Sequence, residues 1–365
     1  MAGEVRDFDY SPWIDKKRVK RMDRTSILAV SAAKMAVEDA GLDLTDGYKE
    51  TAGVMIGTAM AGQAYIIEQH DTFRDKGPMR INPNTALASF PDACSSQISI
   101  ELGIQGPSFQ MATACSSASD AVGIGFEAVR RGWVDCLVVG GADATLFPEA
   151  VAAFSITRAM SRRNHEPTKA SRPFTLDRDG FVLGEGAGIL ILEDYERARK
   201  RGAHIYAEIL SHGMTTDAYH MTAPEPGGLQ AIRAMRMALT QAGIRPGDVD
   251  YINAHGTSTP LNDANETNVI KQVFGTAAYK IPVSATKSMI GHLIGGAGSV
   301  ELVATLLAME HREIPPTINY DMPDPACDLD YVPNVSRKKE INIAMKNSFG
   351  FGGKNSILIV RKVRD

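Results

Sequence analysis

The sequence predicts a layered α/β fold, because short strand-like apolar runs alternate with longer helix-like ones along its 365 residues. Strands are expected at residues 53–58, 136–141, 188–192, 206–210, 251–254, 281–284, 341–345 and 356–360. Helices are expected at residues 26–40, 117–131, 229–242, 263–274 and 299–311, each ending near a glycine, a proline or a basic residue. The 33 glycines suit a globular protein with many tight strand-to-helix turns.

The length predicts two closely packed halves, since single hydrophobic cores stop growing near about 250–300 residues. No Gly/Ser-rich or Pro-rich linker separates the halves, so they should share an interface. We place the join in the charged stretch 196–204 and expect an N-terminal half at 1–200 and a C-terminal half at 201–365. Each half also has a strand that enters a Gly-rich turn and a second strand that closes it.

Charge and hydropathy exclude several classes of function. A net charge of −4 is too small to drive nucleic-acid binding, and no aromatic-rich basic face compensates for it. No apolar run is long enough to predict a membrane span, and the polar residues 1–10 are unlike a signal peptide. We therefore expect a cytoplasmic protein, in which cysteines without CxxC spacing stay reduced and one of them can be reactive.

Cys115 is the first candidate for chemistry. It stands among small residues in the segment ATACSSA, 112–118, just before a predicted helix. The positive end of a helix dipole favours the thiolate and raises the reactivity of a cysteine. A buried structural cysteine beside a capping serine is the alternative, and Cys94, which also precedes two serines, shows how common this tripeptide is.

Two histidines follow predicted strands in the second half. His255 begins the segment HGTSTP and His292 ends the segment TKSMIGH, while the Gly-rich turn NSFGFGG spans 347–353. Loops at the carboxyl ends of strands are where α/β sheets build their sites. One thiol and two imidazoles meeting there would suit acyl-thioester chemistry, with the imidazoles donating to a carbonyl that gains negative charge.

Two other ligand classes are less favoured. The Walker pattern is absent from the Gly-rich segments, which argues against a nucleotide site. A zinc site would need ligands from three distant loops, with no close pair at i, i+3 or i, i+4.

Together, TACSS, HGTSTP, KSMIGH and NSFGFGG resemble the motifs of the β-ketoacyl-ACP synthases, most closely the elongating type II enzymes. The resemblance covers nearly the whole chain and includes RPF at 172–174 and DRDGFVLGEG at 177–186. It implies a thiolase-like fold of two similar βαβ-rich halves layered α-β-α-β-α, with no cofactor and as a homodimer. It further implies decarboxylative condensation of malonyl-ACP with a Cys-bound acyl chain in fatty-acid elongation.

The resemblance also implies roles for individual residues. Cys115 would accept the acyl chain, with its own backbone N–H and that of Phe351 forming the oxyanion hole, and Phe351 acting as an aromatic gate. His255 and His292 would stabilise the enolate. Lys287 and Glu301 match a charged pair that orients the histidine loop. Thr257 and Thr259 match positions that contact the phosphopantetheine arm, whereas Asn253, Glu301 and Asn347 fall where some relatives hold a structural monovalent cation.

The presence of two histidines and Cys115 argues against type III initiating enzymes, thiolases and inert chain-length factors. Two departures from the family pattern stand out. The chain starts after the usual first strand and helix, and we expect that strand to be central to the first sheet, so that its absence would expose an edge. Lys354 replaces the threonine that usually follows the GFGG turn, which puts pantetheine contacts in doubt.

Acyl carrier protein is the expected partner. Five cations lie within residues 16–21, and we expect Lys17, Lys20 and Arg21 to steer this acidic protein, the alternative being a solvated surface. A ketosynthase of polyketide or specialised lipid assembly remains an alternative function, as does a truncated, inactive structural subunit.

Overall fold

A computed structural model describes residues 1–44 and 48–363, in which there are two main sheets and a two-stranded ribbon. The first sheet has the order β2-β1-β3-β4. Its strands are β1 (Ala52–Gly57), β2 (Ser108–Met111), β3 (Cys136–Ala144) and β4 (Glu185–Glu193). β2, β1 and β3 are parallel, and β4 closes the sheet antiparallel to β3. Every residue of β1 and β3 is buried, as expected for a sheet covered on both faces.

The second sheet repeats this plan with the order β5-β11-β10-β6-β7. Its strands are β5 (Glu208–Thr216), β6 (Tyr251–Asn253), β7 (Val283–Ser284), β10 (Ile343–Gly350) and β11 (Lys354–Arg361). β7, β6 and β10 are parallel, and β11 is antiparallel to β10. A short ribbon of β8 (Glu313–Ile314) and β9 (Arg337–Lys338) stands apart from both sheets.

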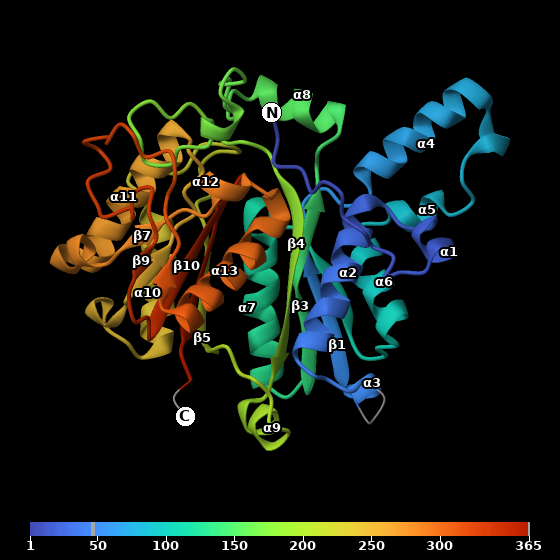
Figure 1. Cartoon of the computed structure of the whole chain (residues 1–365), viewed down its shortest axis with the longest axis horizontal. Coiled ribbons are helices and arrows are strands. Elements are labelled where there is room, and N and C mark those ends of the chain that lie inside the picture. Colours follow the sequence, from blue (N-terminus) through green and yellow to red (C-terminus); the bar gives the residue numbers. More distant parts are fainter. Residues whose placement is uncertain (45–47, 364–365) are drawn as a thin grey trace.

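Helices form three layers around the sheets (Figure 1). α7 (Ser117–Arg130) and α13 (Ala297–His311) lie between the two sheets, where each contacts strands of both. α2 (Arg24–Asp39) and α6 (Ala93–Leu102) cover the first sheet from outside, and α10 (Leu229–Ala242) and α11 (Pro260–Phe274) cover the second. This α-β-α-β-α layering is the predicted thiolase-like architecture.

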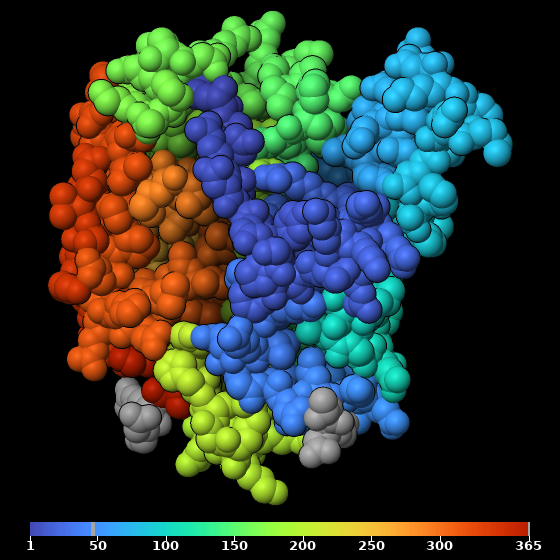
Figure 2. Space-filling view, turned by 45° about the vertical axis from the view of Figure 1, so that its right-hand side comes forward, coloured from blue at the N-terminus to red at the C-terminus, as the bar shows by residue number. Residues whose placement is uncertain are grey.

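Further helices cover the ends and sides of these layers. They are α1 (Lys16–Val19), α3 (Tyr48–Thr51), α4 (Gln63–Lys76), α5 (Thr85–Ser89), α8 (Pro148–Ile156), α9 (Tyr195–Lys200) and α12 (Lys287–Ile290). Figure 2 shows the segment of α4 and α5 projecting from the body of the molecule. The predicted join at 196–204 lies on α9 and the loop after it, between the last strand of one sheet and the first of the other.

The two sheets differ by one strand, and this corrects an expectation. Strands β2-β1-β3-β4 correspond in order and direction to β7-β6-β10-β11, but among the described residues β4 has no neighbour equivalent to β5. β5 is an edge strand, so the expectation that the absent strand would be central is wrong. On the outer faces of the two sheets, α2 packs on β3 and β4, and α10 packs on β11 and β5.

All the strands and helices predicted from periodicity are present, with ends shifted by a few residues; the strand predicted at 206–210 begins at Glu208 and continues to Thr216. β2, α4 and α6 were not predicted. β2 is a four-residue edge strand with exposed positions, and α6 has a weak hydrophobic pattern because the residues that it buries, Ala93, Cys94, Ser95 and Ile98, are mostly small. No helix in the described part of the chain is long and apolar enough to cross a membrane.

Candidate active site

Cys115 occupies a tight turn between β2 and α7. The residue before it, Ala114, has a left-handed backbone (φ 53°), and residues 114–116 form one turn of 3₁₀ helix that leads into α7. Asp120, inside α7, accepts hydrogen bonds from Thr113 Oγ1 at 2.5 Å and Ser116 Oγ at 3.1 Å, which holds this strained turn in place. The structure therefore places the cysteine at the N-terminus of the central helix, as predicted.

The expected thiolate is not the favoured state of Cys115. Burial raises the pKa of its thiol to about 11, and hydrogen bonds from the backbone N–H of Phe351 and of Cys115, together with the charge of Lys287, lower it only in part. The helix end cannot compensate for the loss of water around a side chain that is 7% exposed. The two N–H groups that converge on the sulfur are those predicted for the oxyanion hole.

Glycine at position 350 lets the β10–β11 hairpin approach the cysteine turn. A Cβ atom there would lie 3.1 Å from Thr113 O and 3.2 Å from Cys115 N, closer than side chains ordinarily pack. Because Gly350 ends β10, this approach brings Phe351 beside Cys115.

His255 follows β6 and is fixed by a carboxylate from α11. Glu266 accepts hydrogen bonds from the backbone N–H of His255 at 2.8 Å, from that of Gly256 at 2.9 Å and from Asn347 Nδ2 at 3.0 Å. Burial and then the charge of Lys287 lower the pKa of His255 well below its usual value. The His255 imidazole is therefore neutral near pH 7.

His292 reaches the same place from the end of α12. Its backbone N–H donates to Val182 O at 2.7 Å, and its carbonyl accepts from Gly184 N at 2.9 Å, so a loop of the first half holds it. The rings of His255 and His292 are 5.4 Å apart between centroids and nearly perpendicular. Burial followed by the charges of Lys287 and Lys346 lowers the pKa of His292 well below its usual value, and its Nδ1 has no hydrogen-bond partner in the described part of the chain.

A buried cluster of charges lies behind the histidines. Lys287 Nζ donates to the backbone oxygen of His255 at 2.7 Å and pairs with Glu301 Oε1. The other oxygen of Glu301 lies 2.7 Å from Nζ of Lys346, a second lysine that is fully buried. Lys287 and Glu301 thus lie directly behind His255, and their role in orienting its loop stays a prediction.

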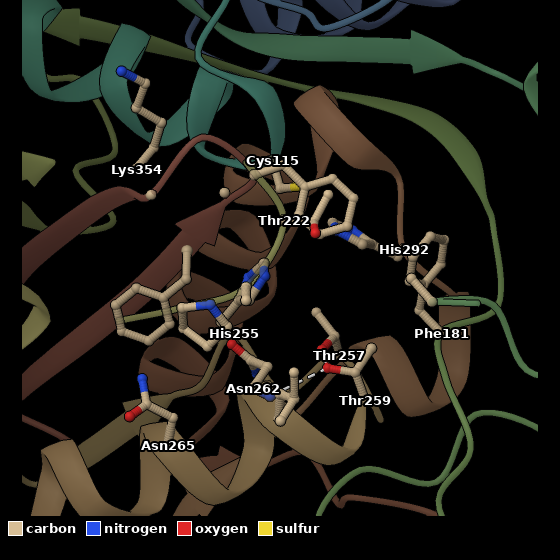
Figure 3. Close-up of a pocket in the computed structure, with 18 of the residues that line it drawn as sticks. Cys115, Phe181, Thr222, His255, Thr257, Thr259, Asn262, Asn265, His292 and Lys354 are labelled. Atoms are coloured by element: carbon tan, nitrogen blue, oxygen red, sulfur yellow. Dashed lines mark hydrogen bonds between the residues drawn. The ribbon is translucent and has the colours of Figure 1, made fainter. Parts of the chain in front are cut away.

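Cys115, His255 and His292 line one pocket of about 310 Å³. In Figure 3 the thiol and the two imidazoles face the same opening, with Thr257 and Thr259 on its lower side. The two threonine hydroxyls are 2.9 Å apart, and Phe351 and Lys354 also contribute to the lining. The structure therefore brings together the predicted nucleophile, histidines, gate and pantetheine-contacting residues.

The predicted docking residues lie elsewhere. Lys17, Lys20 and Arg21 are exposed on and just after α1, beside α2 and α6, whereas the rim of the pocket is formed in part by the start of α11. Figure 1 shows α1 and α11 on opposite sides of the molecule. Within one chain, the basic run and the pocket are not neighbours.

Sequence reasoning missed three residues of the site: Asp120, Glu266 and Lys346. All three are buried, and Asp120 and Lys346 are charges within otherwise apolar or small-residue stretches, whereas Glu266 stands in a polar stretch of α11. Since isolated charges are rarely buried without a partner, such positions were a usable signal of a polar network.

Fold and site together define a thiolase-like condensing enzyme, with a cysteine turn at the start of the central helix and two histidine loops facing it. The sequence models of the "Beta-ketoacyl synthase" N-terminal and C-terminal domains match residues 3–198 and 206–321. The chain belongs to the beta-ketoacyl synthase family.

Individual relatives agree with this membership. The chain is 48% identical to a 3-oxoacyl-[acyl-carrier-protein] synthase 2 of Synechocystis over 99% of this chain and 87% of the relative. It is 46% identical to the enzyme of the same name from Staphylococcus aureus, with the same coverage. A beta-ketoacyl synthase structure from Burkholderia phymatum has a TM-score of 0.92 and 35% identity, covering 100% of this chain and 88% of the other. The ketosynthase structure of a type II polyketide synthase, in complex with its acyl-carrier protein, has a TM-score of 0.91 and 38% identity at the same coverage.

Proposed function

We propose that the chain elongates fatty acids by condensing malonyl-ACP with an acyl group carried on Cys115. The observation that supports this most directly is the pocket in which a buried thiol faces two neutral imidazoles. The names of the Synechocystis and Staphylococcus relatives support the carrier-bound substrate class.

In the first half-reaction, the sulfur of Cys115 attacks the thioester carbonyl of acyl-ACP. The bond between the acyl carbon and the carrier thiol breaks, and the proton of Cys115 leaves with that thiol. The N–H groups of Cys115 and Phe351 are placed to stabilise the oxyanion, because they already point toward the sulfur. The tight turn at Ala114 fixes this geometry before substrate binds.

In the second half-reaction, the carbon–carbon bond to the malonyl carboxylate breaks and carbon dioxide leaves. The electron pair forms an enolate, whose oxygen takes hydrogen bonds from His255 and His292. Neutral imidazoles suit this role, since each has one N–H to donate and need not release a proton first. The enolate carbon then attacks the acyl carbonyl on Cys115, the carbon–sulfur bond breaks, and the released thiolate takes up a proton.

The test is to incubate the purified protein with acyl-ACP and then with malonyl-ACP. Mass spectrometry should show one acyl group on the peptide that contains Cys115, followed by its loss and the appearance of 3-oxoacyl-ACP. A protein that neither takes up an acyl group nor forms product would contradict the proposal.

A polyketide ketosynthase is the second candidate, supported by the similarity to the type II polyketide structure. The two functions differ in the product rather than in the first chemical step. Repeated extension of one chain without any reducing enzyme present would favour the polyketide function, whereas release after a single condensation would favour fatty-acid elongation.

We further propose that the protein forms a homodimer through the edge of β2. Residues on β2 and on the nearby segment of α4 to α6 expose large apolar side chains, and exposed apolar side chains that gather in one region can mark an interface. These are Phe73, Met79, Leu87, Phe90, Ile100 and Phe109. A second copy pairing with β2 would cover both the open edge and these side chains. A monomer in analytical ultracentrifugation would contradict this arrangement.

The carrier protein is the proposed partner, and two basic regions compete as its docking site. Lys17, Lys20 and Arg21 are exposed on one side of the molecule, while Arg158 is exposed at the rim of the pocket and Lys354 lines it. Arg158 and Lys354 are closer than α1 to the pocket that a phosphorylated prosthetic arm would enter. A carrier protein docked at α1 would therefore need a contact that extends beyond this one chain.

The cytoplasm stays the predicted compartment, in agreement with four buried free cysteines.

A further inference from the structure

Lys346 is a fully buried cation in the middle of β10. Its Nζ donates to the backbone oxygen of Asn347, donates to Ser348 Oγ at 2.9 Å, and lies 2.7 Å from Glu301 Oε2. The contact with Glu301 is an ion pair outside hydrogen-bond geometry. Three oxygens, one of them a carboxylate oxygen, thus surround this ammonium.

The family resemblance implies a structural monovalent cation on Asn253, Glu301 and Asn347, and Glu301 is also the ion-pair partner of Lys346. Asn253 is the register partner of Lys346 on the neighbouring strand β6. The side-chain oxygens of Asn253 and Asn347 are buried and have no hydrogen-bond partner among the described residues. Amide and carboxylate oxygens of this kind are the ligands that a hard cation prefers.

A metal ion does not fit here beside Lys346. Two lysines, Lys287 and Lys346, already face Glu301, and Glu266 is a second carboxylate whose charge acts on Lys346. Glu266 is already engaged by the backbone of the His255 loop. Another positive charge would be repelled by both ammonium groups in a region with little water to screen it.

We propose that the ammonium of Lys346 takes the place of that cation and positions the histidine loop without a bound metal ion. One carboxylate oxygen of Glu301 pairs with Lys346, and the other pairs with Lys287. Lys287 in turn contacts the backbone oxygen and the ring of His255. Lys346 is thus a positioning residue that acts through two others. The effect of Lys346 on condensation rests on the proposed function, whereas its effect on the cation dependence of stability does not.

The experiment measures the melting temperature of each variant in choline chloride and in potassium chloride at equal ionic strength. The wild-type protein should melt at the same temperature in both salts. Lys346→Ser should melt earlier in choline and recover in potassium, because a cation can then enter between the free oxygens. Lys346→Met should melt early in both salts. The exposed Lys338 offers a matched control, and Lys338→Met should change nothing.

Activity adds a second readout. Lys346→Ser should lose about 10- to 100-fold in condensation rate in choline, the loss typical for removing a group that orients an active-site ligand, and should regain rate in potassium. In the same variant, the rate of acyl transfer to Cys115 should fall less than the rate of condensation.

A wild-type protein that is stabilised by potassium over choline would overturn the proposal, as would a Lys346→Met variant with wild-type stability and rate. If the wild type does not condense at all, the proposed function fails, while the melting comparison still tests Lys346.

Discussion

The ammonium of Lys287 lies 2.7 Å from the backbone oxygen of His255 and 3.4 Å from Nδ1 of the same residue's ring. An ammonium can only donate, so Nδ1 must accept, and this assigns the ring proton to Nε2 on the other side of the imidazole. His255 is thereby held as a neutral N–H donor whose proton is on the nitrogen remote from Lys287.

Replacing the proposed nucleophile should stop the reaction at its first step. We expect Cys115→Ser to abolish elongation, because an unactivated hydroxyl is a far poorer nucleophile than a thiol or thiolate at neutral pH. Cys94→Ser is the matched control, since that buried cysteine also precedes two serines but lies outside the pocket. Elongation that survives in Cys115→Ala would exclude Cys115 as the nucleophile.

Removing one imidazole should separate the two half-reactions. In His292→Ala the acyl-enzyme should still form, but decarboxylation of malonyl-ACP should slow by about a hundred- to a thousandfold, equivalent to ~2.7–4 kcal/mol for one lost donor. Mass spectrometry of the acyl-enzyme and release of labelled carbon dioxide measure the two steps. Unchanged condensation would remove His292 from the mechanism.

Stability should fall as the solution becomes acidic. The folded-state pKa values of His255 and His292 are well below 6.5, so the unfolded chain binds more protons than the folded one below that pH. The melting temperature should therefore drop as pH falls below about 6.5, the pKa of an unperturbed histidine. The drop should be smaller in His292→Phe and unchanged in His70→Phe, in which an exposed histidine of α4 is replaced. An equal drop in all three proteins would show that other groups are responsible.

Charge reversal should identify the docking surface for the carrier protein. If α1 binds the carrier, changing Lys17, Lys20 and Arg21 to Glu raises KM for acyl-ACP and leaves short acyl-pantetheine substrates unaffected, with a loss that depends on salt. Arg158→Glu should have that effect if docking occurs at the rim of the pocket. Equal losses for both types of substrate would indicate that the basic run supports the fold instead.

The sequence was sufficient to predict the alternating elements and the residues that carry the chemistry. Apolar periodicity located both sheets and the helices around them, because burial on both faces leaves long apolar runs. The motifs around Cys115, His255 and His292 fixed the family, and relatives with 46% and 48% identity agree with it. β2 and α6 were missed because β2 is short and partly exposed and α6 buries mostly small side chains, so neither has a clear apolar period.

Only the tertiary structure decided the charge states and the connections within the site. A helix N-terminus predicts a reactive thiolate at Cys115, yet burial raises the pKa of the thiol to about 11, and burial is a property of the packed fold and not of the local sequence. Lys346 and Glu301 are 45 residues apart in the sequence, and only the packing of α13 against β10 brings the ammonium and the carboxylate to 2.7 Å. The sequence determined which groups are present, and packing determined which of them meet and how much water remains around them.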